Sequence, residues 1–413
     1  MENKIRLLQL LTLILILTIF VTGRFSLSRS YLVEGFLALD VRYILFCVFC
    51  FLVLMLYKEP LLSPSRHSIM FIFILCIFLI YLIFSMFWLH DMNTGKSKFL
   101  DIIFLMLICL GLFFIIHIIK DVEKTAEITA YFFLLMGLFY LSILYANGLN
   151  SEDYRSEVYA GGKNVQTRVL FFAIVSSVFL FNYTGKYRYL ALVFLFIPGI
   201  VLLGSKQGII AAAFVLLLLL CLEFLSFQKI KGFSKNMKEP RAVWTWVLII
   251  VASVVISMIF VKQSNFRFLI SLTTRYAVGY YRFDPALMST RDTLYEGSIQ
   301  VIKEHPIWGI GLAGYNDIPT IGFYPHNIVL EVLLDGGIVA GVLFSLLVFF
   351  AFYIIFKGRL SIYLPFFVLP LYILICAMVS GDLYDFRYYF LWAILSLYFL
   401  FQHNSQDIEC KQN

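Results

Sequence analysis

Long apolar runs separated by short polar stretches dominate the pattern along this chain. A helix that crosses a membrane needs about 20 mostly apolar residues, and roughly twelve runs approach or reach that length. They lie at Arg6–Val21, Val41–Tyr57, Ser68–His90, Phe99–Ile119, Ile128–Ala146, Val169–Tyr183, Tyr189–Leu203, Gly208–Phe227, Val243–Val261, His326–Phe356, Ser361–Ser380 and Leu383–Gln402. The pattern therefore predicts an all-α polytopic membrane protein of about twelve transmembrane helices, with both termini on one side.

One long polar stretch, residues 262–325, interrupts the apolar runs late in the chain. It divides the sequence into an N-terminal bundle of about nine helices, residues 1–261, and about three further helices with a short tail, residues 326–413. We expect this stretch to form one large loop outside the membrane, on the side opposite to the two termini.

The loop is predicted to contain an amphipathic helix that lies on the membrane or on the bundle. Ser289 or Thr290 is a suitable N-cap, and Tyr295, Ile299 and Ile302 recur at helical spacing. We expect the helix to end before Pro306, because the residue before a proline is disfavoured in helical conformation.

Composition and charge agree with a membrane protein and suggest a topology. The 413 residues are 62% hydrophobic and 14% charged, against roughly 45–50% and about 25% in soluble domains. With cytoplasmic termini, the inner loops are short and basic, as the positive-inside rule requires. The outer segments are basic too, with no topological need for it, so they suit either an anionic substrate or anionic lipid headgroups.

His326 is the first candidate for chemistry, because it follows Pro325 at the start of an apolar helix near the predicted outer surface. Imidazoles titrate near neutral pH and act as general bases, although a histidine at a helix end can also simply lie among headgroups. Glu331 and Asp335 follow on the same helix, where carboxylates are costly unless they are paired or hydrated. Asn327 and Glu331 are predicted to support His326.

Four cations near the predicted outer surface are candidates for binding phosphate groups. Arg291 lies at the predicted helix start, where backbone N–H groups and a guanidinium together favour an anion. Lys206 lies in a tight turn between two apolar runs, and Arg168 and Arg387 lie at outer helix ends. Each cation also has an ordinary alternative, namely solvation, snorkelling to headgroups or, for Arg387, pairing with a nearby aspartate.

The run Gly309-Ile310-Gly311-Leu312-Ala313-Gly314 matches the letters of a dinucleotide-binding fingerprint. That fingerprint requires a surrounding βαβ unit, and none is predicted here. We therefore expect its glycines to allow tight turns close to a substrate or to the helix bundle.

Taken in order, these residues resemble a known family. The run from Arg291 through Pro306, Gly309 and Gly311 to His326-Asn327-x-x-Leu330-Glu331, with Gly337 and Gly341 behind it, is similar to the signature of the O-antigen polymerase and O-antigen ligase superfamily. The turn Gly204-Ser205-Lys206 resembles a Ser-Arg turn of that family, with lysine in place of arginine. The resemblance covers the C-terminal half, whereas the first half agrees only in hydropathy.

The resemblance implies a metal-independent, inverting membrane glycosyltransferase of GT-C-like architecture, without a cofactor, in the bacterial cytoplasmic membrane. Its site would face the periplasm or cell exterior. The donor would be a glycan on undecaprenyl pyrophosphate, His326 would be the base, and Arg291 and Lys206 would bind the pyrophosphate, with Arg168 and Arg387 nearby. Membrane lipid and a chain-length regulator protein are the other expected partners, and nucleic acid is not expected.

The motif is shared by the activities of such a family. The Pro325-His326-Asn327 form and the Gly381-Asp382…Arg387 turn resemble a polymerase slightly more, so we expect a polymerase that joins lipid-linked repeat units of O-antigen or capsule. The alternative is an O-antigen ligase, which transfers the same lipid-linked chain to the lipid A core. A transporter of lipid-linked sugars is a weaker alternative, because transporters carry paired repeats and ionisable groups near the midplane, and this chain shows neither pattern.

Overall fold

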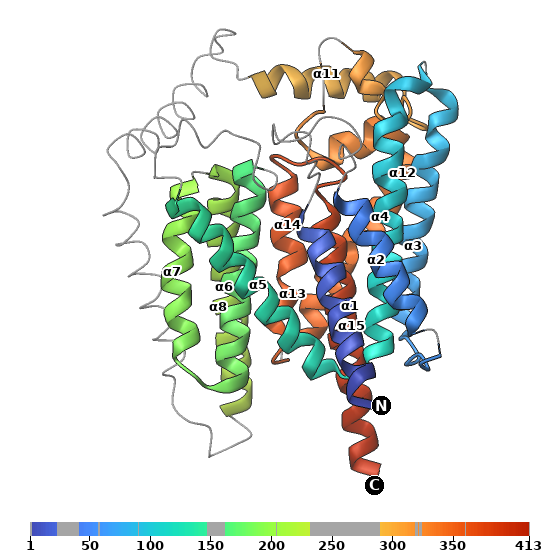
Figure 1. The fold of residues 1–413 in the computed structure, drawn as a ribbon. Coiled ribbons are helices and arrows are strands. Elements are labelled where there is room, and N and C mark those ends of the chain that lie inside the picture. Colours follow the sequence, from blue (N-terminus) through green and yellow to red (C-terminus); the bar gives the residue numbers. More distant parts are fainter. Residues whose placement is uncertain are drawn as a thin grey trace.

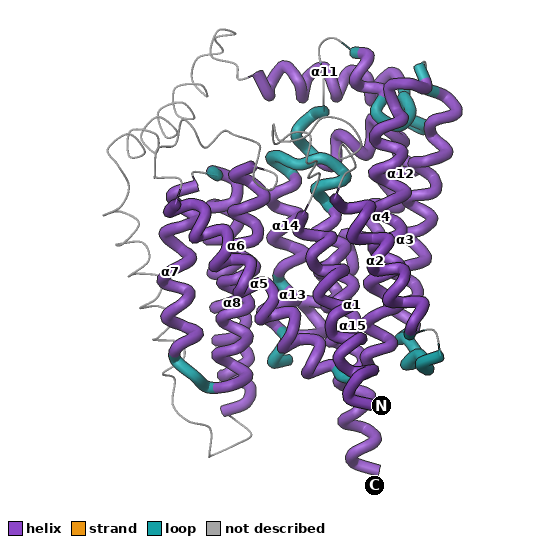
Figure 2. Tube along the Cα trace, viewed as in Figure 1, coloured by secondary structure: helices purple, strands orange, loops and turns teal. Residues whose placement is uncertain are grey.

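The structure, a computed structural model, describes residues 2–22, 41–56, 58–89, 91–146, 162–203, 205–231, 290–318, 321, 324–359 and 361–412. All secondary structure within these ranges is helical (Figures 1 and 2), so the predicted all-α class is confirmed. The predicted span Val243–Val261 and the first part of the predicted loop, residues 262–289, lie outside the described residues.

The first eight described α-helices correspond one by one to the first eight predicted apolar runs. They are α1 (Glu2–Thr22), α2 (Val41–Met55), α3 (Arg66–Phe84), α4 (Met92–Ile119), α5 (Val122–Ala146), α6 (Gly162–Thr184), α7 (Arg188–Leu203) and α8 (Lys206–Lys231). A short 3-10 helix, η3 (Ser85–Trp88), extends α3. Figure 1 shows the helices running alternately up and down, with both termini at one end of the bundle.

The C-terminal part contains α12 (Ile328–Gly358), α13 (Leu364–Phe367), α14 (Leu369–Ala377) and α15 (Arg387–Gln412). The predicted span Ser361–Ser380 contains two helical segments, α13 and α14, which meet at Val368 and together form one apolar stretch, Leu364–Ala377. Pro370 accounts for the break: it has no N–H to donate, and its ring would clash with the carbonyl four residues earlier in a continuous helix.

Six helices in the described part of the chain are long and apolar enough to cross a membrane. They cover Lys4–Thr22, Arg66–Trp88, Met92–Ile119, Val122–Leu144, Asn164–Thr184 and Ile328–Gly358. Shorter apolar helices cover Val41–Met55, Arg188–Val201, Gln207–Glu223 and Leu364–Ala377. The protein is thus a multi-pass helical membrane protein, and the count of twelve spans remains a prediction.

The helix α11 (Thr290–Glu304) lies across the end of the bundle opposite to the termini (Figure 1). Its bounds agree with the predicted start at Thr290 and with an end before Pro306. Leu294, Val301 and Ile302 pack on a small apolar cluster of the following loop and α12. Ile299, predicted for the same face, is 45% exposed, so it does not pack fully on the bundle.

The glycine-rich loop after α11 packs into a break in α12 rather than around a nucleotide. Gly337 interrupts α12 with φ 60° and ψ −156°, a conformation essentially restricted to glycine. The break leaves backbone groups that the loop satisfies, since Ile310 N donates to Leu334 O at 2.8 Å and Ile338 N donates to Pro306 O at 2.9 Å. The expected close approach of these glycines is therefore made to the bundle.

A second short 3-10 helix, η6 (Gly314–Asp317), closes the glycine-rich loop and contacts α4 and α12. Its Tyr315 is buried. The loop, α11 and α12 thus form one packed unit at the end of the bundle where the candidate residues lie.

Candidate functional site

His326 lies in the segment that leads into α12, and its conformation is unusual. Its φ of +55° is left-handed, which few non-glycine residues adopt and which is often found at functional positions. Its ring lies 4.2 Å from the ring of Tyr324, centroid to centroid. The residue predicted to act as the base thus has a constrained backbone and an aromatic neighbour.

Asn327 holds this segment in place from the next position. Its side-chain Oδ1 accepts hydrogen bonds from Val329 N at 2.9 Å and Leu330 N at 3.2 Å, which caps α12. Its Nδ2 donates to Met378 O at 3.0 Å. Asn327 therefore ties the start of α12 to the connection between α14 and α15, residues 378–386, which we call the outer turn.

The outer turn also contacts α6 and, through Asn164 of α6, is linked to the turn before α8. Arg168 Nη2 donates to Ser380 O at 3.0 Å, and Asn164 Nδ2 donates to Ser380 Oγ at 3.3 Å. Ser205, which directly precedes Lys206, donates to Asn164 Oδ1 at 2.9 Å. The outer turn thus connects three parts of the chain that carry predicted site residues.

Arg168 and Arg387 share a partner in this turn. Arg168 Nη1 lies 3.3 Å from Asp385 Oδ2, and Arg387 Nη1 lies 3.2 Å from Asp385 Oδ1. The two arginines are only 2% and 1% exposed, whereas the Asp385 side chain is 32% exposed, so two buried cations hold a half-buried carboxylate of the turn. The alternative that Arg387 pairs with a nearby aspartate is confirmed.

The two arginines differ in the donors that they leave. Arg387 also donates from Nε to Phe20 O at 2.8 Å and from Nη2 to Tyr388 Oη at 3.1 Å, so each of its nitrogens has a protein partner. Arg168 Nε is buried without a hydrogen-bond partner in the structure. A direct role in ligand binding stays a prediction for both, and only Arg168 retains a buried donor for it.

Arg291 and Lys206 can be placed by their helices. Arg291 is the second residue of α11, which packs against α12, and Lys206 is the first residue of α8. Both therefore begin helices whose free backbone N–H groups favour anions. Their roles in pyrophosphate binding stay predictions.

A buried charged cluster next to the predicted site was missed by sequence reasoning. Lys98 Nζ of α4 lies 2.7 Å from Glu331 Oε1 and 2.6 Å from Asp335 Oδ2, and both carboxylates are fully buried. The same Nζ contacts Tyr315 Oη at 2.8 Å, and Asp335 accepts a hydrogen bond from Ala313 N at 2.9 Å. Of the two alternatives for Glu331 and Asp335, paired or hydrated, the structure shows pairing, and their partner Lys98 joins α4, the glycine-rich loop and α12.

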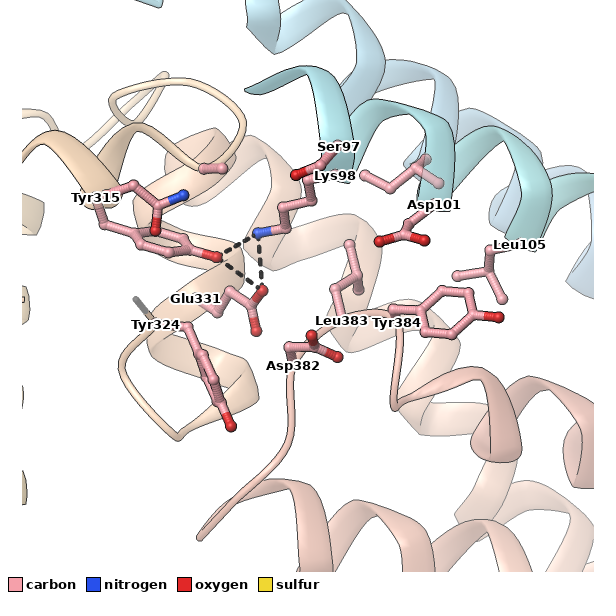
Figure 3. A pocket seen from close by; sticks show the side chains of 13 residues that line it. Ser97, Lys98, Asp101, Leu105, Tyr315, Tyr324, Glu331, Asp382, Leu383 and Tyr384 are labelled. Atoms are coloured by element: carbon pink, nitrogen blue, oxygen red, sulfur yellow. Dashed lines mark hydrogen bonds and ion pairs between the residues drawn. The ribbon is translucent and has the colours of Figure 1, made fainter. Parts of the chain in front are cut away.

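A cavity of about 260 Å³ lies beside this cluster. Figure 3 shows side chains of α4, the segment before α12, α12 itself and the outer turn around it. Its polar and charged lining side chains are Ser97, Lys98, Asp101, Tyr315, Asn316, Tyr324, Glu331, Asp382 and Tyr384. Since Tyr324 also contacts the ring of His326, the cavity adjoins the candidate base.

Asp101 contributes a second buried ion pair to the wall of this cavity. Its Oδ1 lies 3.3 Å from Arg42 Nη1 of α2, and the Arg42 guanidinium lies over the ring of Tyr384, 4.7 Å from its centroid. In the described part of the chain, no group of three or more His, Cys, Asp or Glu side chains is arranged to hold a metal ion. The ionisable groups at this end are instead organised as ion pairs around a polar cavity.

Fold and site together define a multi-pass helical membrane protein with a polar cavity and a conformationally constrained histidine at one end of the bundle. Residues 190–345 match the family model described as O-antigen ligase. This match confirms the resemblance to the O-antigen ligase and polymerase superfamily, over a segment that includes Lys206, Arg291 and His326. No curated protein and no solved structure matches the chain, so the GT-C-like architecture stays a prediction.

Proposed function

We propose that the protein is a glycosyltransferase of the cytoplasmic membrane that polymerises oligosaccharide repeat units carried on undecaprenyl pyrophosphate. The observation that carries the proposal is the convergence on the outer turn. Asn327 beside His326, and Arg168, both contact this turn. Ser205 beside Lys206 is linked to it through Asn164, which contacts both Ser205 and Ser380. These residues come from distant parts of the sequence. The matched family segment spans the residues assigned to the reaction.

In the proposed reaction, His326 accepts the proton of a hydroxyl on the incoming repeat unit. The resulting oxygen nucleophile attacks the anomeric carbon of the donor sugar from the face opposite to the leaving group, so the configuration inverts. The bond from that carbon to the pyrophosphate oxygen breaks, and undecaprenyl pyrophosphate leaves with the bonding electrons. Arg291 and Lys206 stabilise the negative charge of the leaving group.

The ligase is the second candidate, and the description of the matching family model favours it. A ligase uses the same donor, base and leaving group, and differs in its acceptor, the lipid A core. The two activities therefore predict the same essential residues and different products.

The experiment that tests the proposal compares the envelope glycan ladder of a deletion strain complemented with the wild type, His326→Ala or His305→Ala. His305 is an exposed histidine of the same outer segment and serves as the matched control. We expect wild type and His305→Ala to restore long chains, and His326→Ala to fail while it accumulates as folded protein in the membrane.

The products in the deletion strain distinguish the candidates. A lipid A core that carries a single repeat unit supports a polymerase, whereas loss of all attached glycan with full-length chains on undecaprenyl pyrophosphate supports a ligase. An unchanged ladder in the deletion strain, or normal chain length with His326→Ala, contradicts the proposed function or the role of His326, respectively.

A further inference from the structure

The cavity beside the Lys98 cluster has a chemical character that differs from a phosphate site. Its lining includes three carboxylates, Asp101, Glu331 and Asp382, which Figure 3 shows around the same space. Lys98 is the one cationic side chain among the described lining residues. Asp101 is paired with Arg42, which does not itself line the cavity, so the carboxylates of Glu331 and Asp382 are what favours hydrogen-bond donors over anions as ligands.

Lys98 has no donor left for a ligand. An ammonium group has three N–H donors, and Lys98 Nζ has three close oxygen partners in Glu331, Asp335 and Tyr315, at 2.7, 2.6 and 2.8 Å. A phosphate or carboxylate in the cavity would have to displace one of these buried partners and leave it unpaired, which is costly. The one cation of the cavity wall is therefore committed to the protein.

Glu331 presents an oxygen that needs a donor. Its Oε1 is occupied by Lys98 and by Tyr315 Oη, which donates at 3.2 Å. Its Oε2 is buried and has no hydrogen-bond partner, although buried polar atoms in proteins are nearly always satisfied. Because Glu331 is fully buried and lines the cavity, a ligand that carries hydroxyl donors fits this position.

Aromatic rings supply the other part of the wall. Tyr315, Tyr324 and Tyr384 line the cavity, and their rings offer apolar surface to the C–H face of a sugar. Burial first, and nearby carboxylates second, raise the pKa of Tyr315 and Tyr324 above the ordinary value, so both are neutral phenols at neutral pH. The volume of about 260 Å³ is just below the roughly 300–1,000 Å³ of pockets for drug-sized ligands, which suits one sugar ring.

We propose that this cavity binds a single uncharged sugar ring through hydroxyl donors to Glu331 and Asp382, and that it excludes anionic sugars and pyrophosphate. The proposal rests on the proposed function and assigns the ring to the acceptor, because Tyr324 joins the cavity wall to His326, the group that would take the acceptor proton. The pyrophosphate of the donor then lies outside the cavity, toward the starts of α8 and α11.

The test measures binding without catalysis. Binding to full-length protein in nanodiscs of neutral lipid is measured by saturation-transfer-difference NMR. The ligands are methyl glycosides of neutral hexoses, N-acetylhexosamines and 6-deoxyhexoses, then methyl glucuronide, and then inorganic pyrophosphate. We expect at least one neutral glycoside to bind, and neither methyl glucuronide nor pyrophosphate to displace it.

Variants locate the bound sugar. Glu331→Gln and Asp382→Asn each place an amide where a carboxylate accepts, so we expect neutral glycoside binding to weaken about tenfold or more, since hydrogen bonds to charged groups are the strong ones. Tyr324→Ala, which leaves the buried ion pairs intact, is expected to weaken it as well. Glu304→Gln, an exposed carboxylate of α11, is the matched control and should bind as the wild type does.

Two results overturn the proposal: no neutral glycoside binds, which means a cavity filled by water only, or bound glycoside is insensitive to all three cavity variants. Competition by methyl glucuronide or pyrophosphate at equal strength overturns the charge selectivity on which it rests. The glycan ladder separates this failure from failure of the proposed function. If deletion of the gene changes the ladder but no glycoside binds, only the proposed sugar site is rejected. If deletion leaves the ladder unchanged but a glycoside binds in the cavity, only the polymerase or ligase activity is rejected.

Discussion

Removal of the Lys98 side-chain charge tests whether the buried cluster holds the functional end of the bundle together. Lys98→Met keeps the length and the apolar stem of the side chain and leaves Glu331 and Asp335, both 0% exposed, without their cation. Removing one partner of a buried ion pair costs about 3–5 kcal/mol. Asp335 keeps its hydrogen bond from Ala313 N, so we expect the lower half of that range.

The assay is thermal unfolding of purified protein in detergent, with Lys96→Met as the matched control. Lys96 lies two residues away on the same helix and is exposed. At about 2 °C per kcal/mol, the value for larger domains, a loss of about 3 kcal/mol lowers the melting temperature by roughly 6 °C. Lys96→Met should change it by less than about 1 °C, because exposed substitutions usually cost less than about 0.5 kcal/mol.

A compensated variant separates lost charge from lost packing. When a buried ionic group is replaced as a whole by hydrophobic residues of similar volume, stability is often retained. Lys98→Met combined with Glu331→Met and with Asp335→Asn, whose side-chain oxygen can still accept from Ala313 N, is therefore expected to recover most of the lost melting temperature. The reasoning is refuted if Lys98→Met and Lys96→Met have the same melting temperature, or if the triple variant is less stable than Lys98→Met alone.

Two further predictions concern the backbone around the site. Gly337→Ala should lower the melting temperature more than Gly185→Ala. Both glycines have positive φ, so alanine costs backbone strain of roughly 1–3 kcal/mol at either position, but a Cβ at Gly337 would also collide with the carbonyl of Ile307, whereas Gly185 has open space. The difference between the two melting temperatures therefore measures the cost of the collision. Asn327→Ser should keep the α12 cap and unfold close to the wild type, while Asn327→Ala loses about 1 kcal/mol. Both Asn327 variants lose the contact to Met378 and should shorten glycan chains; normal ladders would show that this contact does not position His326.

The helices could be predicted because a long apolar run by itself indicates a membrane-spanning helix. Where the observed bounds differ from the predicted ones, the causes are local. The predicted start of the tenth span at His326 differs from the observed start at Ile328 because the Asn327 side chain caps the helix. The break of the eleventh span at Val368 follows from Pro370, a signal that was present in the sequence. The interruption of α12 at Gly337 depends on the packing of a loop that begins thirty residues earlier, which periodicity does not reveal.

The site was predictable in its residue types and not in its pairings. The cost of carboxylates on an entering helix predicted that Glu331 and Asp335 have partners, but Lys98 lies 237 residues from Asp335 in the sequence. Lys98 directly precedes the predicted span Phe99–Ile119, where a lysine is ordinary flanking sequence of a membrane helix. The ion pair of Arg42 and Asp101 was not predicted either, because the hydrophobic periodicity of a helix does not show which other helix it contacts.

The contacts also divide the predicted cations by what they can do. Arg387 uses its donors on Phe20, Tyr384, Asp385 and Tyr388, so binding an anion would require breaking buried hydrogen bonds, and we infer that it positions the outer turn. Arg168 shares Asp385 but keeps one buried N–H without a partner. The proposed leaving-group stabilisation therefore depends chiefly on the cations at the starts of α8 and α11, which are separate from the carboxylate-lined cavity. If the pyrophosphate binds at these helix starts and the uncharged sugar in the cavity, as proposed, the two ligands do not compete for the same protein groups.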